Sequence, residues 1–470
     1  MSIVYTDVRR AIGFWSGLGL LVGTMIGGGI FRTPASIALV LADPRQILGL
    51  WIFFGVVSMC GALTLAELAT LLPRTGGVYV YLRAAYGDGA AFVFGWLYML
   101  AAVPSGLAAL AVFFGELVLG LAGTTSAAMP WGIPLIAAGM IILFSAANIA
   151  GQRLGSGIQN VFAVIKVGAL LVLIVVALAS SQGEAARWFA APASASTAGG
   201  LAAATKSVMF TFNGWVYICL VGGELEFNGR RLARLILAGT GAVVLLYVLA
   251  NVAYLYLIPL DAMPGKVVAR EVMERVTGPI GGTIIGLCIM ASVCGAMNGV
   301  IFTKSRVAYA LSRDGLSFAV LGRVHPTLAT PYVSILIQGM VAVILIFALR
   351  DPLQPLRLFD RLIAYFIMVE WLALLFTIGA VFVFRRTMAA APRPYRTPGY
   401  PLVPLVFIVG TVLGLAAILW SACSHGDFSP LFGLGIVAAG FPVYYIWRRW
   451  FGGAVAPAAS ATGGTSRPQA

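Results

Sequence analysis

Long apolar runs, separated by short polar gaps, constrain the fold of this chain more than any other feature. Of its 470 residues, 60% are hydrophobic and 10% are charged, whereas soluble domains carry about 25% charged residues. A helix that crosses a bilayer needs about 20 mostly apolar residues. The sequence therefore predicts an all-α polytopic membrane protein with 12 transmembrane helices, at residues 12–39, 47–72, 90–120, 131–149, 156–180, 203–223, 235–258, 280–303, 331–349, 358–384, 401–422 and 429–447.

The net charge of +14 bears on membrane topology. Basic chains often bind nucleic acid, but here Lys and Arg occupy gaps between apolar runs, so no nucleic-acid partner is expected. Cytoplasmic loops carry an excess of Lys and Arg. With a cytoplasmic N-terminus, 19 of the 30 basic residues face the cytoplasm, Lys304 and Arg306 among them, 10 face the other side, and Lys166 lies inside a run. This predicts a multi-pass protein of a plasma membrane with both termini cytoplasmic.

Several kinds of chemistry are not supported by the sequence. The five cysteines are scattered and the chain has only two histidines, so we expect no metal site and no cofactor. Cysteines inside apolar runs behave as small buried hydrophobic residues. Neither a catalytic set nor the G-x-x-x-x-G-K-[ST] motif of nucleotide-driven pumps occurs. An enzyme or an ATP-driven pump is therefore not expected.

Two of the apolar runs contain interruptions. The first has four glycines from Gly23 to Gly29, each of which costs about 1 kcal/mol relative to alanine in a helix. The sixth places Asn213 and Gly214 among aromatic residues, although close helix packing also favours small residues. In lipid, unpaired backbone groups are tolerated where they line a cavity, and interruptions at corresponding positions of two halves mark the site of a secondary transporter. We therefore expect helices 1 and 6 to be broken.

The broken ends predict the chemistry of the ligand. A half-helix that begins near Gly28 presents free N–H groups and a positive dipole end, which suit a carboxylate. Segments that end at 24–26 and at 210–213 present free carbonyls, which suit an ammonium group. An α-amino acid carries both charges. The predicted substrate-binding residues are Thr24, Met25, Ile26, Gly27, Gly28, Gly29, Phe210, Thr211, Asn213 and Gly214.

Three segments resemble the motifs of one transporter family. They are GTMIGGGIF at 23–31, FTFNGWVYICLVGGEL at 210–225 and RPYRTPGYPLVP at 393–404. They are similar to the first helix, the sixth helix and the segment before helix eleven in the amino acid–polyamine–organocation superfamily, especially its L-type amino acid transporter branch. The resemblance covers about residues 8–450.

The resemblance implies a LeuT-like fold of two inverted five-helix repeats plus two C-terminal helices. The repeats are expected at about 12–180 and 203–384, and the last two helices at 401–447, all within one transporter domain at 1–450. The composition of residues 451–470, which are Gly, Ala, Ser, Thr and Pro for the most part, predicts a disordered tail.

The resemblance also implies roles for individual positions. Carboxylate contacts fall on Gly28 and Gly29, and amine contacts on the carbonyls of Met25, Phe210, Thr211 and Asn213. Phe210 matches the aromatic gate over the site, and Trp215 is expected to be a second gate residue. Gly28 stands where many members carry Ser and Val216 where L-type members often carry Asn, so the substrate range stays open.

Two charged side chains lie within apolar runs. Lys166 either snorkels to water or contacts the carbonyls of the unwound first run in place of a sodium ion, as the resemblance implies; it is alternatively a proton carrier. Glu370 pairs with a cation, faces a cationic substrate side chain or forms a hydrogen bond inside the bundle. Cys294 and Asn298 are weaker site candidates.

Together these features predict a sodium-independent secondary active transporter of amino acids that works by alternating access, most simply an exchanger of neutral amino acids. The alternative is a proton-coupled symporter of amino acids or polyamines. Eukaryotic L-type members bond a glycoprotein subunit through a cysteine after the third helix, and residues 121–130 contain none. No disulfide-linked subunit is therefore expected, and a bacterial inner membrane is the predicted location.

Overall fold

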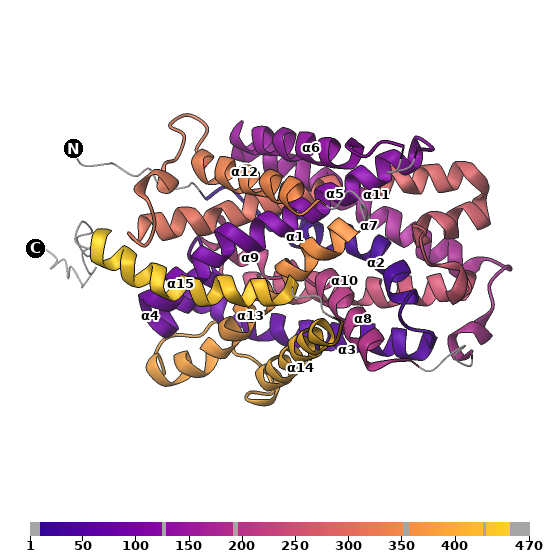
Figure 1. The fold of residues 1–470 in the computed structure, drawn as a ribbon. Coiled ribbons are helices and arrows are strands. Elements are labelled where there is room, and N and C mark those ends of the chain that lie inside the picture. Colours follow the sequence, from indigo (N-terminus) through magenta and orange to yellow (C-terminus); the bar gives the residue numbers. More distant parts are fainter. Residues whose placement is uncertain (1–9, 125–127, 191–195, 351–356, 426–428, 452–470) are drawn as a thin grey trace, which may run out of the picture.

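The computed structural model describes residues 10–124, 128–190, 196–350, 357–425 and 429–451. Over these residues the chain is helical, and its β-structure consists of two isolated bridges. Figure 1 shows the helices side by side in one elongated bundle. The predicted tail at 451–470 lies outside the described residues except for Phe451, which ends the last helix.

The two runs with interruptions form broken helices. The first run gives α1 (Phe14–Met25) and α2 (Gly29–Ala38). The sixth gives α8 (Ala198–Thr211), the short α9 (Tyr217–Leu220) and a 3₁₀ turn at Gly222–Glu224. The breaks in helices 1 and 6 therefore lie where the glycine and asparagine interruptions predicted them.

Continuous helices or helix series account for the other ten runs. They are α3 (Pro44–Leu71), α4 (Val78–Leu97) followed by a π-helical turn (Tyr98–Ala102) and α5 (Val103–Leu121), α6 (Gly132–Ile149), α7 (Gln152–Ala179), α10 (Gly229–Leu257), α11 (Val268–Arg313), α12 (Tyr332–Ala348), α13 (Arg357–Thr387), α14 (Leu402–His425) and α15 (Ser429–Phe451).

Nine helical segments of the described chain are long and apolar enough to cross a membrane. The three further runs in the predicted set of 12 correspond to the broken pair α8 and α9, to α12 with 17 residues, and to α15. Each predicted run thus coincides with a helix or a helix pair. The chain is an all-helical, multi-span membrane protein.

Two long elements bend at glycines with positive φ. Gly87 in α4 has φ +86° and Gly278 in α11 has φ +78°. In each case a short helix precedes the bend and the long apolar helix follows it. The third run therefore starts as a helix at Val78, 12 residues before the predicted boundary at 90, because Arg83 and the stretch Gly87-Asp88-Gly89 interrupt the apolar run.

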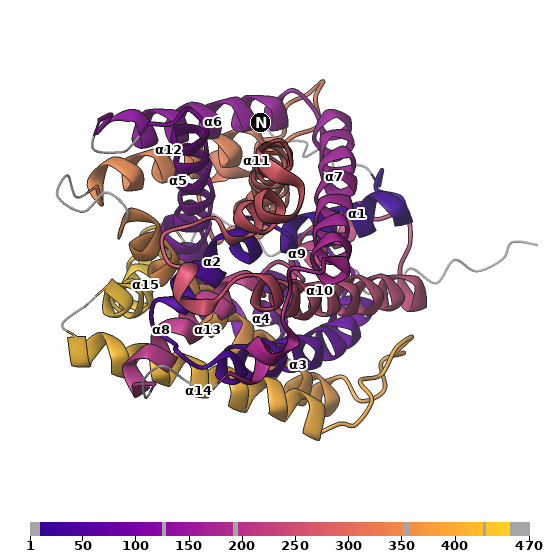
Figure 2. The same ribbon diagram turned by 90° about the vertical axis from the view of Figure 1, so that its right-hand side faces the viewer.

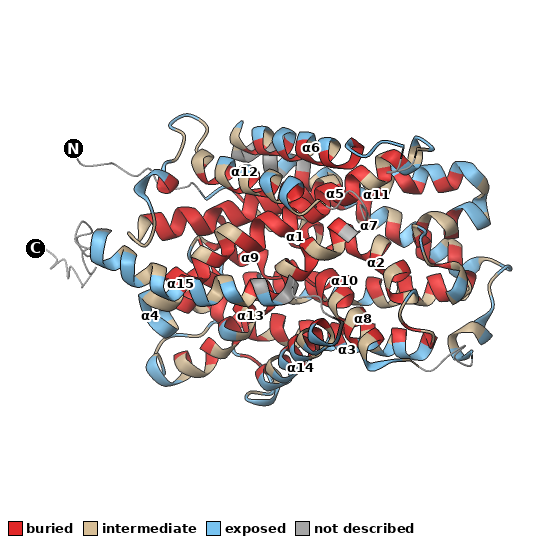
Figure 3. Cartoon of the chain, viewed as in Figure 1, coloured by how far each residue is buried: buried red, intermediate tan, exposed pale blue. Residues whose placement is uncertain are grey.

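The outer surface of the bundle is apolar, as a lipid-facing surface must be. Val164 on α7 and Ile280 on α11 are each 75% exposed, and the outward faces of α6 and α14 are pale blue in Figure 3 while the interior is red. Polar and charged residues such as Lys166, Lys304 and Glu370 are buried in that interior. The bundle thus has an apolar surface as well as a mainly apolar core, whereas a soluble protein has a polar surface.

The broken helices lie inside this bundle. α1 packs against α7, α10 and α11, and α2 packs against α8. α5, α11 and α13 complete the surroundings, and Figure 2 shows α2 in the interior of the bundle. The two breaks are therefore brought together away from lipid.

Candidate functional site

The first break requires glycine for close packing. α1 ends where the Ile26 N–H bonds the Val22 carbonyl at 2.9 Å, and α2 starts at Gly29. Gly28 has an ordinary helical φ of −74°. A Cβ atom on Gly28 would lie 2.5 Å from a ring carbon of Phe113, however, and one on Gly29 would lie 2.6 Å from the Thr211 hydroxyl. These two positions stay small because α5 and α8 approach them directly.

The second break requires glycine for its backbone conformation as well. Gly214 has φ +110°, which side-chain-bearing residues rarely adopt. A Cβ there would lie 2.8 Å from the Thr24 carbonyl oxygen. The Thr24 hydroxyl donates a hydrogen bond to the Gly214 carbonyl at 3.3 Å. The two breaks therefore cross in direct backbone contact.

A small cavity of about 40 Å³ lies beside this crossing. Eight of the ten predicted substrate-binding residues line it, namely Thr24, Met25, Gly27, Gly28, Gly29, Phe210, Thr211 and Asn213. The carbonyls of the other two, Ile26 and Gly214, accept hydrogen bonds from Lys166 and Thr24. The lining residues that sequence reasoning missed are Gly106, Leu110, Tyr217, Ala296, Val300, Lys304 and Phe366.

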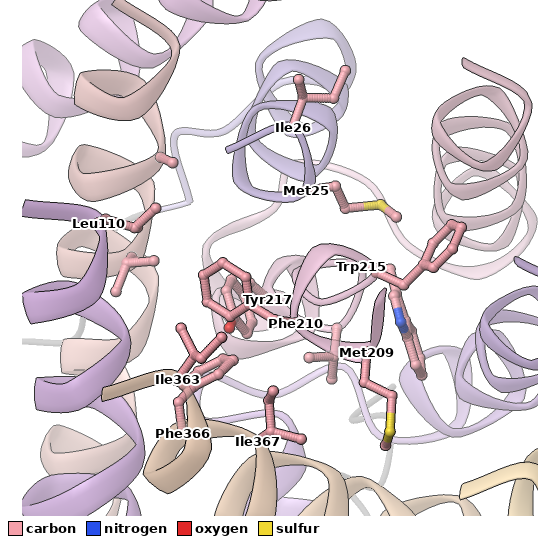
Figure 4. Close-up of a cluster of buried hydrophobic side chains, with 14 of the residues drawn as sticks. Met25, Ile26, Leu110, Met209, Phe210, Trp215, Tyr217, Ile363, Phe366 and Ile367 are labelled. Atoms are coloured by element: carbon pink, nitrogen blue, oxygen red, sulfur yellow. The ribbon is translucent and has the colours of Figure 1, made fainter. Parts of the chain in front are cut away.

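Aromatic rings surround the cavity. Figure 4 shows the rings of Phe210 and Tyr217 together, with Phe366 beside them and Leu110 reaching in from another helix. The Phe210 ring lies 5.8 Å from that of Phe366 and 5.6 Å from that of Phe359. Phe210, the residue for which a gate role is predicted, is thus part of the cavity wall.

The polar atoms of the cavity wall are only partly satisfied. The Tyr247 hydroxyl donates to the Met25 carbonyl at 2.6 Å, and the Tyr217 hydroxyl donates to the side-chain carbonyl of Asn213. The buried amide nitrogen of Asn213 has no hydrogen-bond partner among the described residues. A ligand that accepts a hydrogen bond would satisfy it.

Lys166 does not snorkel to water; it is buried and bonds the first break. Its ammonium donates to the carbonyls of Gly23 at 2.7 Å, Ile26 at 2.8 Å and Ser292 at 2.9 Å. An ammonium has three N–H donors, so all three are used. The side chain thereby ties α7 to α11 and to the unwound part of the first run.

Lys304 and Arg306 correct the topology count. The sequence predicts that both face the cytoplasm, but both lie inside α11 and are buried. Lys304 pairs with Glu370 of α13 at 3.2 Å, and Arg306 pairs with Glu224 at 2.9 Å. A buried side chain with a partner tells little about topology, so 17 of the 19 cytoplasmic assignments remain, against 10 on the other side.

Glu370 is held by more than one contact. Its second oxygen accepts a hydrogen bond from the Tyr98 hydroxyl at 2.9 Å. The rings of Tyr98, Tyr217 and Phe366 surround its partner, with centroids 4.8, 4.3 and 4.8 Å from the Lys304 ammonium. Of the pair, Lys304 lines the cavity. Glu370 therefore stands behind Lys304 and meets a cation, which is one of the roles predicted for it.

The remaining predicted residues lie away from the cavity lining. Trp215 is fully buried and packs against Phe407 of α14 at 5.9 Å. Asn298 joins a polar network, in which it accepts from Asn148 at 2.8 Å and donates to Gln159 at 3.3 Å. Cys294 is half-buried and is also absent from the lining.

The two ends of the bundle differ. At one end, Arg32 of α2 bonds Glu116 of α5 at 2.9 Å, lies 3.9 Å from Asp360 of α13 and stacks on Phe359. At the other end, a cavity of about 830 Å³ opens between the start of the chain, the segment before α4 and the end of α11. Arg74, Arg83 and Asp314 are among the residues that line it.

Comparison with known proteins places this arrangement in a family. The family model for "Amino acid permease" matches residues 12–440. The chain is 29% identical over 443 residues to the "Serine/threonine exchanger SteT" of Bacillus subtilis (strain 168), which covers 93% of this chain and 97% of that relative.

Two mammalian relatives show similar coverage. The chain is 28% identical over 447 residues to the "b(0,+)-type amino acid transporter 1" of Mus musculus, covering 94% of this chain and 88% of the relative. It is 28% identical over 454 residues to the "Large neutral amino acids transporter small subunit 2" of Homo sapiens, covering 94% and 81%. These are transporters and not enzymes, and the matched model spans both broken helices. The chain belongs to the amino acid permease family.

Proposed function

We propose that this permease is a sodium-independent exchanger of neutral amino acids that works by alternating access. The observation that carries the proposal is the cavity at the crossing of the two broken helices, with the unpartnered Asn213 amide in its wall. Backbone N–H and C=O groups without a helical partner are tolerated in the middle of a membrane bundle only where they line a cavity or bond another group.

The substrate is proposed to bind through its constant part. The N-terminal end of α2 at Gly28 and Gly29 suits the carboxylate, since its dipole is positive there. Carbonyls at the ends of α1 and α8, on Met25, Phe210, Thr211 and Asn213, suit the ammonium group. The Met25 carbonyl already accepts from Tyr247, but a carbonyl has a second lone pair for the substrate.

Two inverted five-helix repeats, at about 12–180 and 203–384, are supported by paired irregularities. The first and sixth runs are both broken. The third and eighth are both preceded by a short helix that ends at a positive-φ glycine, Gly87 or Gly278. Each pair is five runs apart, as a repeat of five helices requires.

Sodium independence is proposed from Lys166. Its ammonium already lies between three carbonyl oxygens. Without the lysine, a bound cation such as sodium would have to be their partner. The second candidate function, proton-coupled symport, is favoured by the same observation, because a buried lysine that takes up a proton from one side of the membrane and releases it to the other would move one positive charge with each substrate.

The membrane arrangement is proposed from charge and cysteine positions. With 17 basic residues on one side and 10 on the other, both termini face the cytoplasm. The segment 121–130 has no cysteine, so the permease is proposed to work without a disulfide-linked subunit. A bacterial plasma membrane is the proposed location.

Reconstituted transport tests the proposal. Purified protein in liposomes is expected to take up radiolabelled neutral amino acids when unlabelled amino acid is inside, and equally well in sodium and choline buffers. Gly28→Leu is expected to abolish uptake, because its side chain would collide with Phe113. Gly49→Leu is the matched control, since Gly49 is exposed on α3 and a Cβ there meets nothing within 4 Å.

Two results would overturn the proposal. If an inward proton gradient drives uptake into liposomes that contain no amino acid, the permease is a proton-coupled symporter and not an exchanger. Absence of uptake for every amino acid, with Gly49→Leu and the unmodified protein equally well folded, would remove the function itself.

A further inference from the structure

The two buried lysines next to the breaks differ in how many hydrogen bonds they make. Lys166 gives all three of its N–H groups to backbone carbonyls. Lys304 makes one hydrogen bond within the described part of the chain, to Glu370 at 3.2 Å. The rings of Tyr98, Tyr217 and Phe366 face the rest of its ammonium. Lys304 therefore keeps N–H donors that a hydrogen-bond acceptor could use.

Lys304 is placed to meet a bound molecule. Ala296, Val300 and Lys304 follow one another at intervals of four along α11, so they share one face of the helix. All three line the cavity beside Gly28 and Gly29. The part of the cavity wall that α11 supplies is therefore apolar at Ala296 and Val300 and cationic at Lys304.

Charge balance restricts what can sit there. Lys304 and Glu370 are each 1% exposed and neutralise one another. A cationic substrate side chain would meet the Lys304 ammonium first, and an anionic one would bring a second negative charge next to Glu370. Unpaired charge is costly in such a buried site. An uncharged side chain with an oxygen acceptor avoids both penalties.

Size restricts the substrate further. The cavity of about 40 Å³ has room for only a few waters, since each needs about 10–15 Å³ by this measure. Leu110, Val300 and Phe366 close it. A Cβ atom on Gly106 would lie 2.8 Å from the Phe366 ring, so the wall between α5 and α13 has no spare space.

We propose that Lys304 is the specificity-determining residue of this permease, and that it donates a hydrogen bond to the side-chain oxygen of small uncharged amino acids such as serine and threonine. Glu370 is the positioning residue that holds the ammonium against the cavity. This inference rests on the proposed amino acid transport and names its substrate class.

The test compares serine with alanine, which differs by the hydroxyl alone. In proteoliposomes exchanging labelled alanine, unlabelled serine is expected to compete better than unlabelled alanine. The double variant K304M/E370Q removes both charges together and keeps an acceptor for Tyr98, whereas a single change would leave one charge buried and unpaired. The serine-over-alanine preference is expected to fall about 10- to 100-fold, the equivalent of one charge-assisted hydrogen bond, while alanine exchange persists.

The control is K266M/E271Q, which removes an exposed pair of the same kind, at 2.9 Å, and is expected to leave the preference unchanged. An unchanged preference in folded K304M/E370Q, or equal competition by serine and alanine in the unmodified protein, would overturn the inference and leave amino acid transport standing. If the unmodified protein does not exchange alanine or any other amino acid, the proposed function itself is wrong. Strong competition by glutamate or lysine would show that the charge argument is wrong.

Discussion

Lys166 holds the first break to a neighbouring helix through a single side chain. Its three hydrogen bonds join Gly23 and Ile26 of the first break to Ser292 of α11. Met has nearly the same length without the charge or the donors. We expect Lys166→Met to abolish exchange and to lower the free energy of unfolding by about 1–3 kcal/mol, because buried carbonyls lose their donor.

Thermal unfolding and exchange, measured on the same preparations, check this expectation. Lys266→Met is the control, because Lys266 is exposed, with a side chain 46% accessible. A Lys166→Met protein that melts and exchanges like the unmodified one would show that the ammonium plays no part in holding the break.

The sequence predicted some residues of the site and missed others for a physical reason. Gly28 and Gly29 stood out because they belong to three consecutive glycines, and Asn213 stood out because it places a polar amide inside an apolar run. Lys304 was assigned to a loop because the apolar run stopped just before it, at residue 303. Only the tertiary structure reveals that α11 continues to Arg313 and that Glu370 of α13 neutralises the charge.

Among the helices, the positions of both breaks could be predicted from the sequence. The reason why each break needs a glycine could be predicted only in part. Gly28 has a common φ of −74° and is needed for contact with Phe113. Gly214 has φ +110° and is needed for conformation and contact together. A sequence shows that small residues cluster; it does not show which neighbouring helix approaches them.

Gly214→Ala tests the crossing of the two broken elements. The new Cβ would lie 2.8 Å from the Thr24 carbonyl oxygen and would force an unfavourable φ. Residues held in such backbone regions cost about 1–3 kcal/mol. We expect a loss of exchange of at least tenfold and a lower melting temperature.

Gly49→Ala on α3 serves as its control. This glycine has open space around it, and alanine is about 1 kcal/mol better than glycine in a helix interior. The control is expected to melt at or above the temperature of the unmodified protein. Equal behaviour of the two alanine variants would mean that the breaks tolerate displacement.

At the scale of the whole molecule, the bundle is closed at one end and open at the other. Arg32, Glu116 and Asp360 join α2, α5 and α13 at the closed end. The cavity of about 830 Å³ lies at the end that carries Arg74 and Asp314. With the proposed topology the end held by Arg32 is outside, and the cavity of about 830 Å³ lies on the cytoplasmic side.

Alternating access then requires the contacts of Arg32 to break when the outer end opens. The side chains of Arg32 and Glu116 are 13% and 16% exposed, and pairs near the surface are worth up to about 1 kcal/mol. Removing the pair should therefore shift the balance toward the outward-open state by roughly fivefold. Leu110 lines the central cavity, so a cysteine there would report the opening.

In a background without the five native cysteines, we expect Arg32→Gln to raise severalfold the rate at which a membrane-impermeant maleimide modifies Leu110→Cys from outside. Arg45→Gln is the matched control, because Arg45 pairs with Asp43 two residues away and forms no ion pair with a second helix within the described ranges. If both variants react at the rate of the parent, Arg32 does not hold the outer end closed. If Arg32→Gln alone reacts faster, three charged side chains remote from the substrate set the resting state of the permease, because they are the ionic contacts that link α2 to α5 and α13 at that end.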